Sequence, residues 1–276
     1  MKTFEVTQNC NLREFTDSVF PQGAFYLSRL LRAKDIKVNG KRVSSDIALF
    51  KGDSVTYYTT PAQEAKSSHE VIFEDENILV ADKFSGVTSE GLFYELGEGC
   101  FPVHRLDRNT AGLIVFAHTE KAQEELINAF KEYRTEKIYL AILKNSFTKK
   151  EDRLSAYLVK DANAALVKVF DRPQKGGAEI LTDYRILEER GDIALAEITL
   201  HTGRTHQIRA HMAHIGCPVL GDGKYGDNQL NKKYGLSRQA LLAKRLTLFS
   251  EGELKYLNGK TFESGQNIEF PQKKEK

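Results

Sequence analysis

Short runs in which hydrophobic and polar residues alternate make up much of the chain beyond its first quarter. In residues 69–83, β-branched and aromatic residues lie on both sides of an acidic turn, a pattern that predicts two short strands. Residues 137–143 predict another strand. Ala196, Ile198 and Leu200 alternate with polar neighbours, as in a strand with one buried face. The pattern therefore indicates a sheet-rich region.

Two segments have hydrophobic residues at helical spacing instead. The first helix is expected to begin after Thr119, which can cap it, and its hydrophobic residues recur at a period of about 3.6 residues. These residues are Ala122, Leu126, Ala129, Phe130 and Tyr133. The second helix is expected over residues 205–215, with Gly216 ending it. Many strands with few long helices predict an α+β fold, a mostly antiparallel mixed sheet flanked by helices.

A different pattern precedes this region. Leu27, Leu30 and Leu31 predict a short helix, and Asn39-Gly40 predicts the turn of a hairpin. Residues 59–68 contain a proline and small polar residues without periodicity, as linkers do. We therefore expect a small αβ module over residues 1–60, a linker over 61–68 and a larger domain over 69–276.

Composition narrows the class of protein. The 276 residues are 41% hydrophobic and 28% charged, which suits a globular protein and excludes a disordered chain. Uninterrupted apolar stretches are far shorter than the roughly 20 residues that cross a membrane, and no secretory signal is visible at the N-terminus. We therefore expect a cytoplasmic protein. Its three cysteines lie far apart, which predicts reduced thiols rather than a disulfide framework or a CxxC-type metal site.

Charge is informative only locally. Forty basic and thirty-eight acidic residues give a net charge of +2, which does not by itself indicate a nucleic-acid partner. Basic residues nevertheless cluster between the first helix and its hairpin, where Asp35 is the single acid among them. Such a cluster is either a solvated face or an RNA-binding surface. Its members are Arg29, Arg32, Lys34, Lys37, Lys41 and Arg42.

Two motifs carry polar residues that packing alone does not require. They are HRLDRNTAG at residues 104–112 and GRTHQIR at residues 203–209. Each lies at the end of a predicted regular element, where a rigid scaffold can position catalytic groups. Either motif alone could be a salt-bridged turn, since an isolated aspartate between arginines is more often a surface ion pair than a catalyst.

Together the two motifs resemble the RluA family of pseudouridine synthases, and the resemblance covers most of the chain after the linker. The similarity runs from EDENILVADK through KIYLAIL to GDGKYG at residues 221–226. Residues 27–53 are similar to the alpha-L RNA-binding module, a combination that the family uses. Departures from the family pattern are Phe84 after Lys83, Ala111 in the first motif, and Leu242 near the C-terminus.

The resemblance implies a role for each motif residue. Asp107 is the catalytic aspartate, Arg209 pairs with it, and Tyr139 is the ring on which the target base stacks. An arginine within about 4–6 Å would keep the carboxylate ionised. Ile208 closes the pocket on its apolar side, and Arg105 fills the gap left by the flipped base. Arg204 and His206 are expected to contact the substrate or to brace the pocket.

We therefore expect an enzyme that isomerises uridines in structured rRNA or tRNA to pseudouridine, without cofactor or metal, as a monomer. One alternative is a non-catalytic RNA-binding or ribosome-assembly factor on the same scaffold. Another is a hydrolase of glycosidic bonds, although that class commonly needs a second carboxylate or a metal to activate water. His211 and His214 lie one turn apart on the second helix, but no acidic or cysteine ligand completes a zinc site in the sequence.

Overall fold

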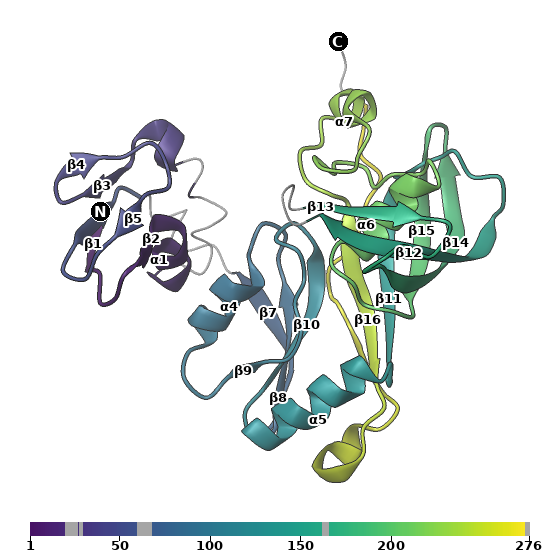
Figure 1. Ribbon diagram of the computed structural model, residues 1–276, viewed down its shortest axis with the longest axis horizontal. Coiled ribbons are helices and arrows are strands. Elements are labelled where there is room, and N and C mark those ends of the chain that lie inside the picture. The colour runs from purple at the N-terminus through teal and green to yellow at the C-terminus, as the bar shows by residue number, and fades with distance from the viewer. Residues whose placement is uncertain (20–26, 28–29, 60–67, 162–165, 274–276) are drawn as a thin grey trace.

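A computed structural model describes residues 1–19, 27, 30–59, 68–161 and 166–273 of the chain (Figure 1). Its N-terminal part forms a four-stranded antiparallel sheet in the order β1-β6-β3-β4. The short pair β2–β5 and helix α1 complete this part. The bounds are β1 Lys2–Glu5, β2 Cys10–Asn11, α1 Leu12–Val19, β3 Ile36–Val38, β4 Lys41–Arg42, β5 Ala48–Leu49 and β6 Ser54–Tyr57.

The remaining strands form one large sheet in the order β13-β12-β14-β15-β11-β16-β10-β8-β7, with β9 beside β10 and β17 beside β16. Among the described residues every pairing in this sheet is antiparallel except β10 with β16. The strands are β7 His69–Glu74, β8 Ile78–Lys83, β9 Phe101–Pro102, β10 Ala111–Ala117, β11 Thr135–Lys144, β12 Glu151–Asp161, β13 Leu166–Phe170, β14 Ala178–Arg190, β15 Ile193–Leu200, β16 Leu241–Leu248 and β17 Lys260–Glu263. The predicted α+β class with a mostly antiparallel sheet is confirmed.

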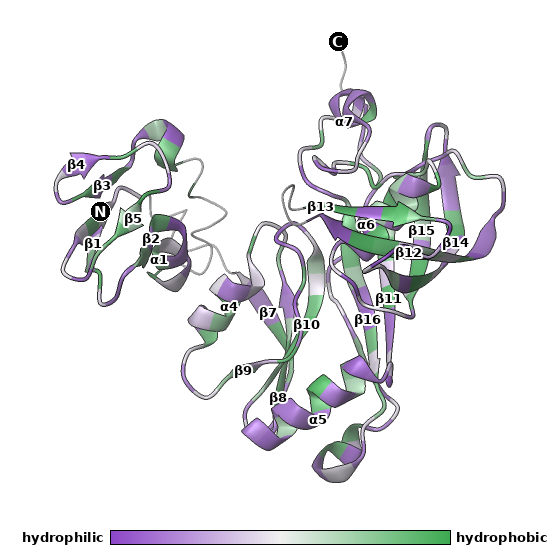
Figure 2. Cartoon of the chain, viewed as in Figure 1, coloured by the Kyte–Doolittle hydropathy of each residue, from purple (hydrophilic) through white to green (hydrophobic). Residues whose placement is uncertain are grey.

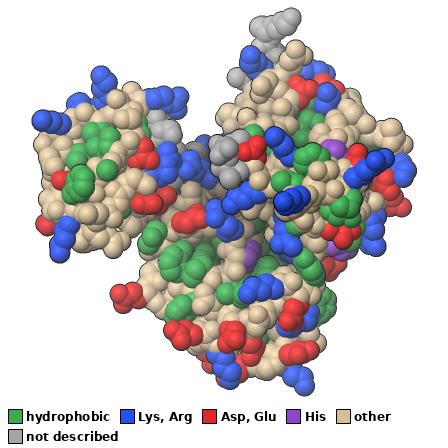
Figure 3. Space-filling view, in the orientation of Figure 1, with side chains coloured by type: hydrophobic (Ala, Val, Ile, Leu, Met, Phe, Trp, Pro, Cys, Tyr) green, Lys and Arg blue, Asp and Glu red, His purple; other side chains and the backbone are tan. Residues whose placement is uncertain are grey.

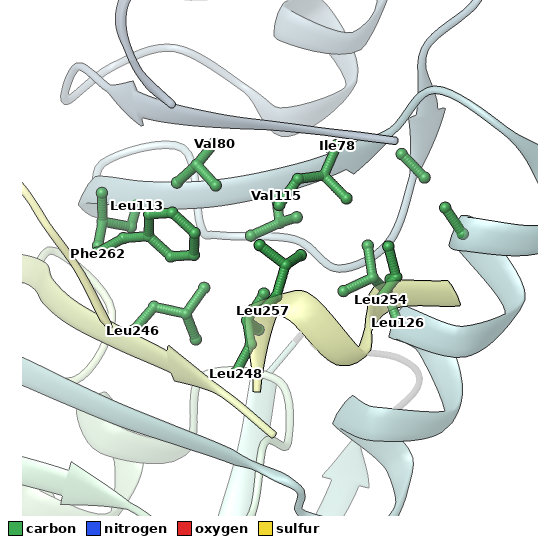
Figure 4. Close-up of a cluster of buried hydrophobic side chains, with 12 residues drawn as sticks. Ile78, Val80, Leu113, Val115, Leu126, Leu246, Leu248, Leu254, Leu257 and Phe262 are labelled. Atoms are coloured by element: carbon green, nitrogen blue, oxygen red, sulfur yellow. The ribbon is translucent and has the colours of Figure 1, made fainter. Parts of the chain in front are cut away.

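Helices flank the large sheet. They are α4 Ser89–Leu96, α5 Glu120–Lys131, α6 Gln207–His214 and α7 Asn228–Tyr234, with the 3-10 helix η1 at Gly252–Leu257. Leu126 of α5 and Leu254 and Leu257 of η1 are buried against strands β8, β10, β16 and β17 (Figure 4). Along α5 the hydrophobic and hydrophilic residues occupy different faces (Figure 2). The apolar stripe that predicted this helix is thus the face that closes the core.

The N-terminal part has a hydrophobic core of its own, which includes Leu12, Ile36 and Val55. Helix α1 lies beside α4 of the large domain. Lysine and arginine side chains gather where the two parts of the chain face each other (Figure 3). No helix in the described ranges is long and apolar enough to cross a membrane.

Most predicted elements are present. Thr119 caps α5 by accepting a hydrogen bond from the backbone N–H of Ala122, and Asn39 and Gly40 both have the positive φ angles of a tight hairpin turn. The prediction that α5 continues to Tyr133 is wrong, because the helix ends at Lys131 and Tyr133 adopts a left-handed conformation with φ of 58°. The predicted linker lies outside the described residues apart from Ser68, and so does Arg29.

Candidate active site

A cleft of about 640 Å³ opens between the large sheet and helix α6. Its walls come from the loop before β10, the end of α5, strand β11 and the first turn of α6. The motifs at residues 104–112 and 203–209 therefore face each other across one cavity. Volumes of this size are typical of sites for small organic ligands.

Asp107 lies on the loop before β10, and its side chain is 24% exposed. Oδ2 of Asp107 accepts a hydrogen bond from Nη1 of Arg209 at 2.7 Å. Arg209 projects from α6 and its side chain is only 8% exposed, so the pair is largely shielded from water. The carboxylate–guanidinium pair expected from the motifs is present. The hydrogen bond from the guanidinium to the carboxylate is charge-assisted.

Asp222 holds the other side of Arg209, a role that the sequence analysis did not assign. Its two oxygens accept from Nε and Nη2 of Arg209 at 2.7 and 2.9 Å, and its side chain is fully buried. Burial would raise the pKa of Asp222, but the bonds from Arg209 and from the backbone N–H groups of Lys224 and Tyr225 lower it. Asp222 belongs to the motif GDGKYG, and its position between glycines of a recognised motif was the available signal.

Lys83 supports the loop that carries Asp107. The side chain is fully buried, and its Nζ donates to the backbone carbonyls of Val87 at 2.8 Å and Thr110 at 2.6 Å. Carbonyls of Phe84 and Arg108 lie at 3.3 and 3.2 Å. Burial lowers the pKa of Lys83 to about 7, and the negative charges of Asp107 and Glu90 act in the opposite direction. The amine thus ties the end of β8 to the turn at residues 107–110.

Tyr139 and Ile208 give the cleft its apolar surface beside the carboxylate. Tyr139 lies on β11, is partly buried among hydrophobic residues and lines the cleft. Burial, and then the charge of Asp107, raise the pKa of the Tyr139 hydroxyl, so the neutral phenol is the stable form. Ile208, in the first turn of α6, is 4% exposed and lines the same cavity. A flat ring and an aliphatic group therefore lie next to the carboxylate of Asp107.

His206 adds a second polar group near Asp107. The hydroxyl of Tyr225 accepts from the backbone N–H of Val167 at 2.9 Å and is hydrogen-bonded to Nδ1 of His206, also at 2.9 Å. Nε2 of His206 faces Oδ1 of Asp107 at 3.8 Å. Burial lowers the pKa of His206, which favours the neutral ring.

The two remaining predicted residues lie at the exposed surface of the cleft. Arg204 and Arg105 are exposed and line the cleft, and Arg105 pairs with Glu90 at 3.1 Å. A cavity rim with two exposed guanidinium groups is accessible to phosphates or bases.

The basic cluster of the N-terminal part is partly engaged within the chain. Arg42 pairs with Asp35 at 3.8 Å and donates to the carbonyl of Lys34, and the ring of Tyr58 lies near both Arg42 and Lys37. Lys34 adopts a left-handed backbone with φ of 57°, Lys41 is exposed, and Arg32 lies in the helix before β3. On the β3–β4 hairpin, Lys37 and Arg42 thus lie beside the ring of Tyr58, which follows β6.

No group of three His, Cys, Asp or Glu side chains in the described part of the chain is arranged to hold a metal ion. Nδ1 of His211 lies 3.1 Å from the hydroxyl of Thr182, and Nε2 of His214 lies 2.7 Å from Asp171. The two histidines on α6 thus have separate partners.

The cleft combines a paired carboxylate with a tyrosine ring on a large, mostly antiparallel sheet. Residues 62–214 match the family model described as RNA pseudouridylate synthase, so the chain belongs to this family of RNA-modifying isomerases. The family expected from the motifs is confirmed.

Similar proteins agree with this assignment. A ribosomal large subunit pseudouridine synthase C of Rickettsia bellii is 30% identical over 236 residues, which cover 74% of this chain and 78% of that protein. An uncharacterized RNA pseudouridine synthase of Aquifex aeolicus is 32% identical over 232 residues, covering 73% of this chain and 72% of that protein. The solved structure of human RNA pseudouridylate synthase domain containing 1 is 26% identical, with a TM-score of 0.59, and covers 68% of this chain and 82% of that one.

Proposed function

We propose that this protein isomerises specific uridines in structured RNA and that Asp107 is the catalytic carboxylate. The observation that carries the proposal is the bond of 2.7 Å between Asp107 and the buried Arg209 at the wall of a ligand-sized cleft. In the reaction the bond from ribose C1′ to uracil N1 breaks and a bond from C1′ to C5 forms. The proton on C5 leaves and N1 gains one, so no oxidant or reductant is needed.

The other residues of the cleft fit the needs of that reaction. A base can reach the carboxylate only after it leaves its helix, and an aromatic ring is a suitable platform for it. Tyr139 supplies the ring and Ile208 the apolar contact that retains the detached uracil. Arg105, exposed on the rim, has the planar group that could stack in the position of the flipped base. Arg204 and His206 would contact the nucleotide or its phosphates.

The names of the relatives suggest the class of target RNA, and the N-terminal part suggests how the RNA is bound. Relatives are named as large-subunit ribosomal synthases, which favours ribosomal RNA over transfer RNA as the first RNA to examine. We propose that the RNA binds the basic hairpin of the N-terminal module, residues 1–60. A linker over residues 61–68 would join this module to the catalytic domain, residues 69–276. This division explains why the basic cluster lies on a separate sheet. We propose that the reaction takes place in the cytoplasm and that a monomer carries it out.

The substitution Asp107→Asn tests the proposal. Pseudouridine would be mapped across total RNA from cells with and without the gene, and the missing site would be restored by the wild-type gene but not by the variant. Purified Asp107→Asn should still bind RNA with wild-type affinity, because the amide has almost the same shape. Wild-type protein that binds RNA without turnover would instead indicate a non-catalytic factor, and free uracil would indicate a hydrolase.

A further inference from the structure

The turn after α5 contains a residue that the backbone does not favour. The N–H of Arg134 donates to the carbonyl of Ala129 at 2.8 Å, which closes the helix in a Schellman-type turn and leaves Tyr133 at the left-handed position. Glycine is preferred at this position because a Cβ crowds the following carbonyl. A tyrosine with φ of 58° is therefore strained.

The side chain of Tyr133 makes few contacts that could stabilise the fold. Tyr133 is 51% exposed, and within the described ranges its side chain has no hydrogen bond and no ring contact. Its side chain instead lines the active-site cleft, together with Phe130 and the exposed Lys131. Backbone strain at a residue whose aromatic ring is exposed beside a binding cleft indicates a functional contact.

Lys137 lies on the same wall. It precedes Tyr139 by two residues on β11, so both side chains are on one face of the sheet, about 6.6 Å apart along the strand. Lys137 is 8% exposed, and no carboxylate or carbonyl in the described part of the chain pairs with its Nζ. Nζ lies 6.0 Å from the centroid of the Phe130 ring and next to Gly203 on the opposite wall. A buried cation that lacks an anion is costly unless a ligand supplies the anion.

We infer that the α5–β11 wall of the cleft is a second nucleotide site, in which Tyr133 stacks on a base next to the target uridine and Lys137 neutralises a backbone phosphate. An aromatic platform with a nearby cation is how proteins bind unpaired nucleotides without reading their sequence. The inference rests on the proposed action on RNA, and it assigns a residue pair outside the group around Asp107. It explains both the strained tyrosine and the unpaired lysine.

Tyr133→Gly and Tyr133→Phe test the stacking. The substrate is total RNA labelled with [5-³H]uridine in cells that lack the gene, and turnover is followed as tritium released from C5. We expect Tyr133→Gly to lower kcat/KM by about 5-fold or more, mainly through KM, because stacking on one base contributes that much to binding. Tyr133→Phe should remain within 2-fold of wild type, since it keeps the ring.

Thermal unfolding separates stacking from a structural role. Glycine suits the left-handed turn, so the melting temperature of Tyr133→Gly should equal or exceed that of wild type while activity falls. Tyr133→Asn, which also tolerates this conformation, provides a second variant. As a control, Tyr256→Ala removes a tyrosine that is 52% exposed and does not line the cleft, and it should leave kcat/KM unchanged. Activity of Tyr133→Gly or Tyr133→Asn within 2-fold of wild type would overturn the inference.

Lys137→Met tests the phosphate contact with a fluorescein-labelled nine-residue oligouridylate as the probe. Loss of one phosphate contact should reduce the slope of log affinity against log salt by about 0.7, whereas Tyr133→Gly should leave the slope unchanged. An unchanged slope for Lys137→Met would exclude the phosphate contact. If wild-type protein releases no tritium from any RNA, the proposed function fails, whereas normal turnover by both variants refutes only the second site.

Discussion

Asp222 accepts hydrogen bonds from two nitrogens of Arg209 and thereby orients the third, Nη1, toward Asp107. The bonds from Arg209 to Asp222 measure 2.7 and 2.9 Å, and the bond to Asp107 measures 2.7 Å. One guanidinium thus bridges a fully buried carboxylate and a partly exposed one. Because the fork of arginine is planar and rigid, the buried aspartate determines the direction of the bond to the proposed catalytic group.

Asp222→Asn should therefore reduce turnover without a change in RNA binding. The amide removes the charge that orients Arg209, and a displacement of about 1 Å can reduce kcat by up to about 100-fold. Loss of one partner of a buried pair should also lower the free energy of unfolding by about 3 kcal/mol. Tritium release and urea unfolding measure the two effects. Glu188→Gln, which breaks an exposed pair with Arg190, is the control and should change stability by less than about 1 kcal/mol.

Lys83→Met should destabilise the loop that carries Asp107. Methionine fills much of the same space but leaves the carbonyls of Val87 and Thr110 without a donor. We expect the free energy of unfolding to fall by more than about 2 kcal/mol, together with a loss of activity. Lys144→Met removes a lysine whose side chain is itself exposed and pairs with Asp227, and its effect should stay below about 1 kcal/mol. Equal effects of the two variants in urea unfolding would contradict this role of Lys83.

Gly112→Ala should be among the most damaging small substitutions. Gly112 has φ of 107°, and a Cβ at this position would lie 2.3 Å from the backbone oxygen of Ala243 on the parallel neighbour β16. The clash and the unfavourable φ should together lower stability by about 3 kcal/mol or more. Gly191→Ala also replaces a glycine of positive φ, but in open space, and should lower stability by only about 1 kcal/mol. Similar melting temperatures for the two variants would rule out the steric explanation.

Stability should decrease in mild acid because of His211. Burial lowers the pKa of this histidine to about 4, below its ordinary value near 6.5. Between these pH values the unfolded chain binds more protons than the folded chain, so the free energy of unfolding falls as pH drops from about 7 to 4. His211→Asn should remove about 1–3 kcal/mol of that dependence, whereas His214→Asn, at a more exposed site, should not. Urea unfolding at pH 7 and pH 5 measures the difference, and equal slopes for wild type and His211→Asn would contradict the assignment.

The local pattern of hydrophobic and polar residues was sufficient to predict helices and strands of this protein. The alternation around Ala196 and Ile198 and the apolar stripe through Leu126 each predicted an element that the structure contains, because backbone periodicity and burial of one face are local properties. The turn at Asn39-Gly40 was predicted because these two residue types tolerate the positive φ angles that the structure has there. The motifs at residues 104–112 and 203–209 were recognisable as a pair because their residue types and spacing are properties of the sequence itself.

Only the tertiary structure showed that Asp222 joins the predicted pair of Asp107 and Arg209. Asp107, Arg209 and Asp222 come from loops and a helix that the order of strands in the large sheet brings together, and periodicity carries no information on that order. The burial of Lys83 under four carbonyls depends likewise on where β8 ends against the loop before β10. Tyr133 continues the apolar stripe of α5 in sequence but lies in the cleft, because the Schellman-type turn ends the helix before it.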